Sequence, residues 1–308
     1  IGMGLVTLEG DAWSRHRRII QPSFQANFLK ESLNAVVPVR TAILIDAWRQ
    51  AQGSVINLST HMSALTLDII GEVAFAHDFG ACRTLQSWAE KANSSHARAE
   101  NNGDLEKVPD PLIQAFAGSL MISGLGIALT LLGWQKLEKY LNRKVALTRR
   151  MLNEAVDNVI REARSKSASS STAKGPPSRK SLLQLLFEAT DAAETEHRKK
   201  LSDRELRDEA KTFIMAGHET TSTWCYWALY ALAKYPDVQQ KVYEEIIKHA
   251  KDTSTPITLE QLDEMPYLTA FMTEILRLYT PVGLIVRFTS RQETFKGYTI
   301  PPKTRLVI

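Results

Sequence analysis

The stretch AGHETTSTW, residues 216–224, places a histidine, a glutamate and two threonines inside a segment that otherwise has the apolar periodicity of a buried helix. Upstream of it, Ser202 and Glu205 match a capping box. The periodic pattern then continues from Leu206 to Ala233, where the letters KYPD interrupt it. The sequence therefore predicts one long helix with polar groups near its centre, and those groups need a chemical explanation.

Small residues and a threonine set the centre of this predicted helix apart. Ala216 and Gly217 lack side-chain bulk, so a flat cofactor can lie close to the helix backbone. The Thr220 hydroxyl can bond back to a carbonyl one turn earlier and open a groove, which Glu219 can connect to solvent protons. A Gly–Thr kink in a packed helix is the plainer alternative.

A zinc site is the other chemical hypothesis for this stretch. His218 and Glu219 begin an HExxH pattern, in which two histidines one turn apart bind zinc. Ser222 stands where the second histidine is needed, so the pattern argues against zinc. Cys82 and Cys225 lie far apart without CxxC spacing, which predicts two small buried residues rather than a disulfide framework or a zinc cluster.

Length, composition and charge indicate a globular protein. A chain of 308 residues with 44% hydrophobic content can bury a large core, in one large domain or two smaller ones. The net charge of +4 is small, and the basic residues are interleaved with acids. Nucleic acid is therefore not indicated as a partner.

Apolar residues at three- and four-residue spacings predict further helices, so the fold class is mainly α. The expected segments are residues 37–48, 58–75, 137–163, 237–251, a short helix capped by Thr258 and Gln261, and 266–279. From Leu284 onward the pattern changes to strand and turn, with Gly297, Pro301 and Pro302 as breaks. This tail adds a small β component.

Two segments differ from the rest in composition. Residues 111–135 carry no charge and are long enough for a membrane-spanning helix of ~20 residues, although glycines, hydroxyl residues and Gln114 dilute their apolarity. A buried helix pair or a segment that dips into the membrane interface fits them equally well. Residues 165–180 are rich in Ser, Pro, Gly and Lys, which predicts a flexible surface loop.

Two further motifs accompany AGHETT along the chain. Near the start, GDAWSRHRRIIQPSF carries Trp13 and Arg17 in a WxxxR pattern. Further on, EILR places Glu274 and Arg277 three apart on one helical face, and Arg287 follows it in LYTPVGLIVR. In type, order and spacing these motifs resemble those of the cytochromes P450, the haem-thiolate monooxygenases. The resemblance covers almost the whole chain and is weakest from Cys82 to Gln135.

The resemblance implies a mainly α, P450-like fold that holds haem. The side chains expected to bind the haem propionates are Trp13, Arg17 and Arg287. Ala216 and Gly217 are expected to lie against the haem, and Glu274 with Arg277 forms the family's structural pair. For the helix around Trp13, the alternative is an exposed basic surface on which Arg15, His16 and Arg18 are solvated.

The implied activity is insertion of one atom of dioxygen into an apolar organic substrate, with electrons from an NADPH-dependent reductase or a ferredoxin-type donor. Thr220 would hold the oxygen-bound water, and Glu219 would assist proton delivery. The expected substrate contacts are Phe213, Val282, Leu284 and Ile285. Arg15 and Arg18 are interpreted either as a surface for an acidic electron donor or as plain solvated residues.

Membrane association follows from the same resemblance. Residues 111–135 fall where family members carry helices over the substrate entrance, so we expect them to contact a membrane rather than to span it. The expected location is membrane-associated, at the endoplasmic reticulum if the source is eukaryotic.

Several departures limit the interpretation to a partial cytochrome P450 domain over residues 1–308. The resemblance implies that the cysteine that ligates haem iron is expected beyond Ile308, and that the family's N-terminal anchor and first β-rich lobe are expected before Ile1. Lys303 stands where the family has glycine. We therefore expect this segment alone to be inactive. Two alternatives are a truncated, non-catalytic P450 product and a helical membrane-associated protein without haem.

Overall fold

The computed structural model describes residues 2–51, 54–92, 146, 150–165, 181–191, 200–250 and 256–308. Within them the chain is mainly helical. The helices are α1 (Gly10–Ile20), the 3-10 helix η1 (Gln21–Phe24), α2 (Ala26–Gln50), α3 (Leu58–Phe75), α4 (Ala81–Ala92), residues 150–165, α8 (Leu182–Asp191), α9 (Asp203–Lys234), α10 (Pro236–His249), α11 (Leu259–Asp263) and α12 (Pro266–Leu278). The mainly α class predicted from periodicity is confirmed.

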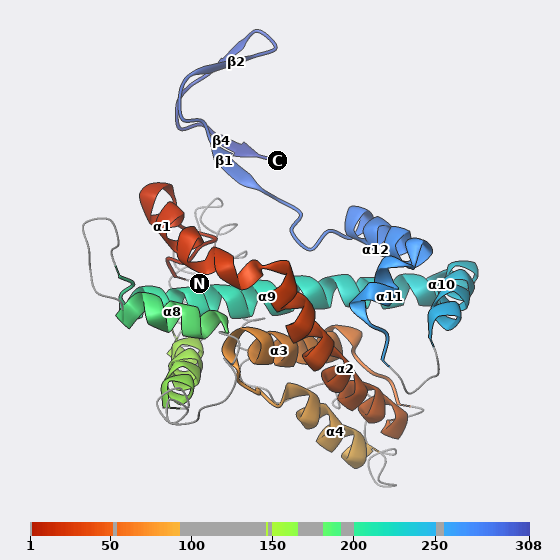
Figure 1. Cartoon of the computed structure of the whole chain (residues 1–308). Helices are drawn as coiled ribbons and strands as arrows, with labels where there is room; N and C mark the ends of the chain where they lie inside the picture. The colour runs from red at the N-terminus through yellow and green to blue at the C-terminus, as the bar shows by residue number, and fades with distance from the viewer. Residues whose placement is uncertain are drawn as a thin grey trace.

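The long helix α9 runs through the middle of the molecule, with the other helices arranged along it (Figure 1). It begins at the predicted capping box: the Ser202 hydroxyl accepts the Glu205 backbone N–H, and the Glu205 carboxylate accepts the Ser202 backbone N–H. It ends at Lys234, because Pro236 starts α10 two residues later. Two local signals therefore define a helix of 32 residues.

Helix α3 packs against α9 and supplies much of the core. Ala64, Leu67 and Phe75 on α3 are fully buried, and they belong to one cluster with Ala210 and Ile214 of α9. The burial of α3 on more than one face explains why its apolar residues are not confined to a single stripe. Its predicted bounds, residues 58–75, are confirmed.

Helix α2 begins at Ala26, eleven residues before the predicted start at residue 37. Pro38 lies inside it and obscures the helical pattern at the point where the prediction began. Farther along α2, the buried Arg40 side chain bonds the carboxylates of Glu72 and Asp78, at 2.8 and 2.9 Å. This ion-pair cluster joins α2 to α3 and to the turn that precedes α4.

A buried aspartate starts α4. Asp68 of α3 is fully buried, and its two carboxylate oxygens accept the backbone N–H groups of Ala81 and Cys82, each at 2.9 Å. These N–H groups belong to the first turn of α4, where a helix leaves them without internal partners. A residue of one helix therefore satisfies the start of the next, across 13 residues of sequence.

The C-terminal part consists of short strands that extend away from the helices (Figure 1). Strand β1 (Val286–Phe288) pairs antiparallel with β4 (Arg305–Val307), and β2 (Glu293–Phe295) pairs antiparallel with β3 (Tyr298–Ile300). At the junction, the Thr289 hydroxyl donates to the Pro301 carbonyl and accepts the Thr304 backbone N–H. The predicted small β component is confirmed as these two ladders.

Some predicted segments lie outside the described residues. The uncharged segment 111–135 is one of them, and so is the loop 165–180 except Ser165, which ends a helical stretch. Of the predicted helix 137–163, residues 146 and 150–163 are described and are helical. In the part of the chain that the structure describes, no helix combines the length and the apolarity needed to cross a membrane.

Candidate functional site

The Thr220 side chain bonds back to its own helix, as predicted. Its hydroxyl donates to the carbonyl oxygen of Ala216 at 2.7 Å, and both residues are partly buried. Because this hydrogen bond uses the hydroxyl proton, the lone pairs of Thr220 Oγ1 are left to accept a hydrogen bond from another group. The Ala216 carbonyl in turn carries a second acceptor contact in the middle of α9.

Gly217 permits the close approach of α3 to α9. A Cβ atom added at Gly217 would lie 2.6 Å from both Cγ1 and Cδ1 of Ile70. One residue further, the backbone carbonyl of His218 accepts a hydrogen bond from the Thr66 hydroxyl at 2.8 Å. The missing side chain at Gly217 therefore serves the contact between the two helices, a role that the sequence pattern did not reveal.

A cavity of about 260 Å³ lies beside this part of α9. Phe213, Ala216 and Gly217 contribute to its wall from α9, and Ile70, Val73 and Ala74 contribute from α3. The Phe213 ring meets Phe24 with ring centroids 5.8 Å apart. Phe213, expected to contact substrate, thus lines an apolar space one helical turn from Ala216.

The two titratable residues of AGHETT have different surroundings. Glu219 is partly buried, and burial raises the pKa of its carboxyl, which brings the group closer to exchanging protons near neutral pH. His218 is buried, with Nδ1 3.2 Å from the Ile214 carbonyl oxygen. The histidine is held inside the helix packing, whereas the glutamate is the better placed of the two to move protons.

On α1, Trp13 and Arg17 lie against each other. The Arg17 guanidinium carbon is 5.0 Å from the centre of the Trp13 ring, which indicates a cation–π contact. Trp13 is partly buried and Arg17 is exposed. Within the described residues, the Arg17 guanidinium makes no ion pair, so its donors are available to a carboxylate.

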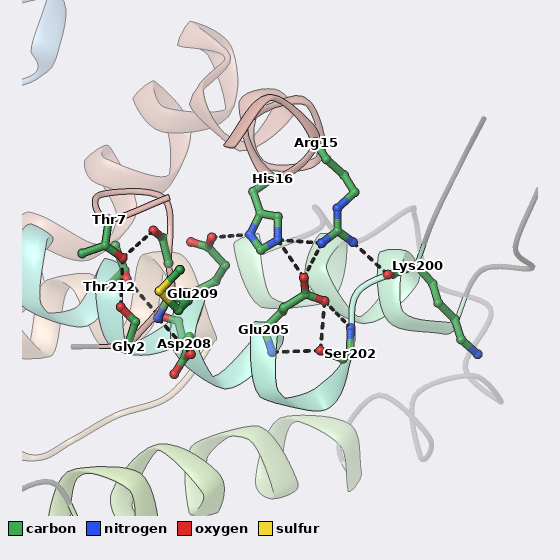
Figure 2. A network of polar contacts seen from close by, with 12 residues as sticks. Gly2, Thr7, Arg15, His16, Lys200, Ser202, Glu205, Asp208, Glu209 and Thr212 are labelled. Atoms are coloured by element: carbon green, nitrogen blue, oxygen red, sulfur yellow. Dashed lines mark hydrogen bonds and ion pairs between the residues drawn. The ribbon is translucent and has the colours of Figure 1, made fainter. Parts of the chain in front are cut away.

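The neighbouring residues of α1 form a polar network with the first turns of α9 (Figure 2). Arg15 bonds the Glu205 carboxylate, and His16 lies between the carboxylates of Glu205 and Glu209. The alternative in which Arg15, His16 and Arg18 are all solvated is therefore wrong for His16, which is 1% exposed, and Arg15 is partly buried and bonded, whereas Arg18 is exposed. Their partners are about 190 residues away in sequence, and the only sequence signal was a pair of glutamates four apart at the start of α9.

The predicted pair on α12 forms as expected. Arg277 Nε and Nη2 donate to the two carboxylate oxygens of Glu274, at 2.7 and 2.6 Å. This hydrogen bonding lowers the pKa of Glu274. Both side chains are more than half exposed. Trp224, the last residue of the opening motif, donates from Nε1 to the Met272 carbonyl at 3.0 Å and so fastens α12 to α9.

The remaining predicted residues lie apart from the cavity. Val282, Leu284 and Ile285 precede β1 and are exposed, and none of them lines the cavity beside α9. Arg287, on β1, is exposed and donates to the Val286 carbonyl oxygen at 2.9 Å. In the described residues, therefore, the structure brings Phe213 and Ala216 together but leaves the C-terminal candidates separate.

Neither cysteine resembles a metal ligand. Cys82 is fully buried, and burial together with the neighbouring Asp68 carboxylate raises the pKa of its thiol. Burial also raises the pKa of the Cys225 thiol. Because the thiolate is the form that binds iron, these surroundings oppose ligation by either residue.

The helical fold and its three motifs, on α1, α9 and α12, are those of a haem protein. Comparisons with known proteins agree with this assignment. The family model described as Cytochrome P450 matches residues 1–308, and the chain belongs to this family. Human cytochrome P450 4Z1 is 32% identical over 304 residues, which cover 98% of the chain and 55% of that protein. Rat cytochrome P450 4A2 is 29% identical over 313 residues, covering 100% and 57%.

A solved structure supports the fold. The crystal structure of the cytochrome P450DA haem domain matches with a TM-score of 0.73 and 24% identity, over 99% of this chain and 58% of that one. This likeness bears on the arrangement of the helices and strands. The chain spans about half the length of the curated relatives that it matches, 55% and 57% for the two above.

Proposed function

We propose that this chain is part of a haem-dependent monooxygenase that inserts one atom of dioxygen into an apolar organic substrate. The observation that carries the proposal is the hydrogen bond from Thr220 to the Ala216 carbonyl inside the AGHETT motif of a cytochrome P450 chain. The alternative of a helical membrane protein unrelated to haem enzymes does not account for the family match over residues 1–308.

The side chains on α1 fit the carboxylates of haem. Arg17 offers guanidinium donors that no carboxylate of the described residues occupies, and Trp13 lies directly beside it. We assign Trp13, Arg17 and Arg287 to the propionates, and Ala216 to the haem-side surface of α9. Gly217 lines the same cavity as Ala216, and we assign its backbone to that surface too, although the position of its missing side chain is taken up by Ile70 of α3. The iron ligand of the full-length protein is then a residue other than Cys82 and Cys225, consistent with the raised pKa of both thiols.

Bound haem supplies the iron at which dioxygen is activated. The side chains of this chain bind a water molecule and transfer protons to it. Thr220 Oγ1, with its own proton donated to Ala216, accepts a hydrogen bond from a water molecule and holds it beside α9. Glu219, with its raised pKa, takes up protons from solvent and passes them to that water.

The substrate and the partners follow from the surfaces described. Phe213 in the apolar cavity provides a contact suited to an apolar substrate. Val282, Leu284 and Ile285 after α12 are exposed apolar side chains outside that cavity, and we assign them to the substrate in the full-length protein. The electrons come from an NADPH-dependent reductase or a ferredoxin-type donor. Arg18 is the better candidate for contact with an acidic donor, because Arg15 is bonded to Glu205. We place the protein at a membrane, the endoplasmic reticulum if eukaryotic, with residues 111–135 in contact with lipid.

The proposal is tested in the full-length protein by replacing Thr220. Thr220→Val removes the hydroxyl at nearly constant volume, and Thr220→Ser keeps it as a control. With a generic apolar substrate panel and an electron donor, we expect Thr220→Val to lower product formed per dioxygen consumed by about tenfold or more. Thr220→Ser should stay within about threefold of the parent protein.

Two results would contradict the proposal. One is full-length protein that binds no haem when it is supplied during folding and measured by its absorption spectrum. The other is unchanged product per dioxygen in Thr220→Val, because the hydroxyl would then have no part in holding the water. The first result would also favour a non-catalytic product of the same family.

A further inference from the structure

A buried imidazole–carboxylate pair joins α1 to α9. His16 Nδ1 lies 2.6 Å from Glu209 Oε1, and the two residues are 1% and 0% exposed (Figure 2). A hydrogen bond this short between buried groups has a narrow range of favourable geometry. The pair therefore constrains the distance and also the rotation between the two helices.

The second ring nitrogen of His16 also has polar contacts. His16 Nε2 lies 3.3 Å from Glu205 Oε1 and 3.1 Å from an Arg15 guanidinium nitrogen, while Arg15 also donates to the Lys200 carbonyl oxygen at 2.9 Å. Burial opposes ionisation of Glu205, but hydrogen bonds from Ser202, Arg15 and His16 outweigh it and lower its pKa to about 2. The capping box that starts α9 is thus part of the same network as α1.

Stability by itself does not account for this pair. Glu209 Oε2 is buried and has no hydrogen-bond partner in the described residues, which is unfavourable for a carboxylate. Two well-packed apolar side chains in place of a buried polar pair often leave a protein equally stable or more stable. What apolar side chains cannot provide is a directional link between the helices.

The positions of the pair connect it with the groups already described. His16 lies three residues after Trp13 and one before Arg17, so the rotation of α1 about His16 decides where those two side chains point. Glu209 lies seven residues before Ala216, about 10 Å along α9 and on nearly the same side of the helix. The pair thus relates the donors of α1 to the Ala216–Thr220 region of α9.

We infer that His16 and Glu209 are positioning residues that fix α1 on α9 and so hold Trp13 and Arg17 in the orientation that binds the carboxylates of haem. This inference rests on the proposed function. Neither residue touches the cofactor in this account, and both act through the orientation of α1.

The test uses the full-length, haem-loaded protein and the double variant His16→Leu with Glu209→Met. This change removes the directional link and the unpartnered carboxylate oxygen while it keeps the interior filled. The measurement is the rate at which haem transfers to an excess of an apo-globin acceptor, together with the urea midpoint of the apoprotein. We expect haem to leave about tenfold faster, with the midpoint unchanged or higher.

Two further variants separate positioning from a general loss of structure. His16→Gln keeps a side-chain amide that can donate to Glu209, so haem loss should stay within about threefold of the parent rate. Trp48→Phe removes another interhelical hydrogen bond, from Trp48 Nε1 to His61 Nδ1 at 2.8 Å, which joins α2 to α3 and does not touch α1. It should leave the rate of haem loss unchanged, whatever it does to the midpoint.

The outcomes distinguish the inference from the proposal on which it rests. Parent protein that never binds haem would overturn the proposed function and this inference together. If the parent binds haem and the double variant releases it at the parent rate, only the positioning role is overturned. Equal acceleration in Trp48→Phe would overturn it too, because haem loss would then follow any weakening of the helix packing.

Discussion

The contact between α3 and α9 and the segment from α12 to β4 both carry P450 motif residues, but they hold them in opposite ways. At the α3–α9 contact, Thr66 bonds the His218 carbonyl, and Gly217 lies against Ile70. In the C-terminal segment, Glu274 and Arg277 bond only each other within the described residues and are more than half exposed.

Tertiary packing sets the geometry of the motif residues at the α3–α9 contact but not in the C-terminal segment. At the α3–α9 contact each group is restrained by a residue from another helix, so a change of one methyl group must displace a neighbour. In the C-terminal segment the pair is local and its surroundings are solvent. Substitutions at the α3–α9 contact should therefore lower the stability of the fold strongly, and comparable substitutions in the C-terminal segment should lower it little.

The largest loss of stability is expected from substitution of Gly217. Gly217→Val would place branched carbon atoms where even a Cβ meets Ile70 at 2.6 Å, and we expect a loss of about 2–3 kcal/mol in the free energy of unfolding. Urea denaturation followed by circular dichroism measures the change. Gly283→Val is the matched control, since a Cβ at Gly283 meets nothing within 4 Å.

A compensating change sharpens the same test. Ile70→Ala combined with Gly217→Val removes the side-chain atoms that the valine would displace, so part of the lost stability should return. If Gly217→Val and Gly283→Val destabilise equally, the close approach of α3 and α9 is not what Gly217 provides.

An intermediate effect is expected from acid at His61 on α3. Burial lowers the pKa of His61 to about 4, and Trp48 Nε1 donates to its Nδ1, which must then be unprotonated. The unfolded state takes up this proton near pH 6.5, before the folded state does, so stability should fall as pH drops from 6.5 toward 4. Between pH 7 and pH 5 this residue should account for about 2 kcal/mol at most.

The measurement is the free energy of unfolding as a function of pH. His61→Gln is the control, because glutamine does not titrate and its carbonyl can still accept from Trp48. The variant should lose less stability than the parent between pH 7 and pH 5. Equal acid sensitivity of the two proteins would show that other groups are responsible.

The smallest effect is expected at Glu274 on α12. In the chain of residues 1–308, Glu274→Gln should not change the thermal midpoint measurably. The Glu274–Arg277 pair is exposed, and exposed ion pairs contribute little to the stability of the folded state. A large drop in the midpoint would contradict the contrast between the two regions. The same substitution in the full-length protein would show whether that contrast persists there.

Much of the fold was predictable from short-range patterns. The two capping boxes, the bounds of α3, the hydrogen bond from Thr220 to Ala216 and the Glu274–Arg277 pair all formed as expected. Each of them joins residues three or four apart, or follows a simple helical repeat, so the sequence neighbourhood contains both partners.

Other features could not be predicted because their partners are distant in sequence. The start of α2 was missed, since Pro38 interrupts its pattern and packing overrides that signal. The sequence allowed Arg15 and His16 to lie on a solvated basic surface as one alternative, yet their partners are Glu205 and Glu209 of α9. No local rule connects residues about 190 positions apart.

The family, the mainly helical class and the local geometry of each motif follow from the sequence alone, because they depend on residue types at fixed short spacings. The contact of Gly217 with Ile70 and the burial of His16 against Glu209 became visible only in the folded chain. Both facts depend on which helix faces lie together. That choice is made by burial of apolar surface over the whole domain, and no single stretch of sequence contains it.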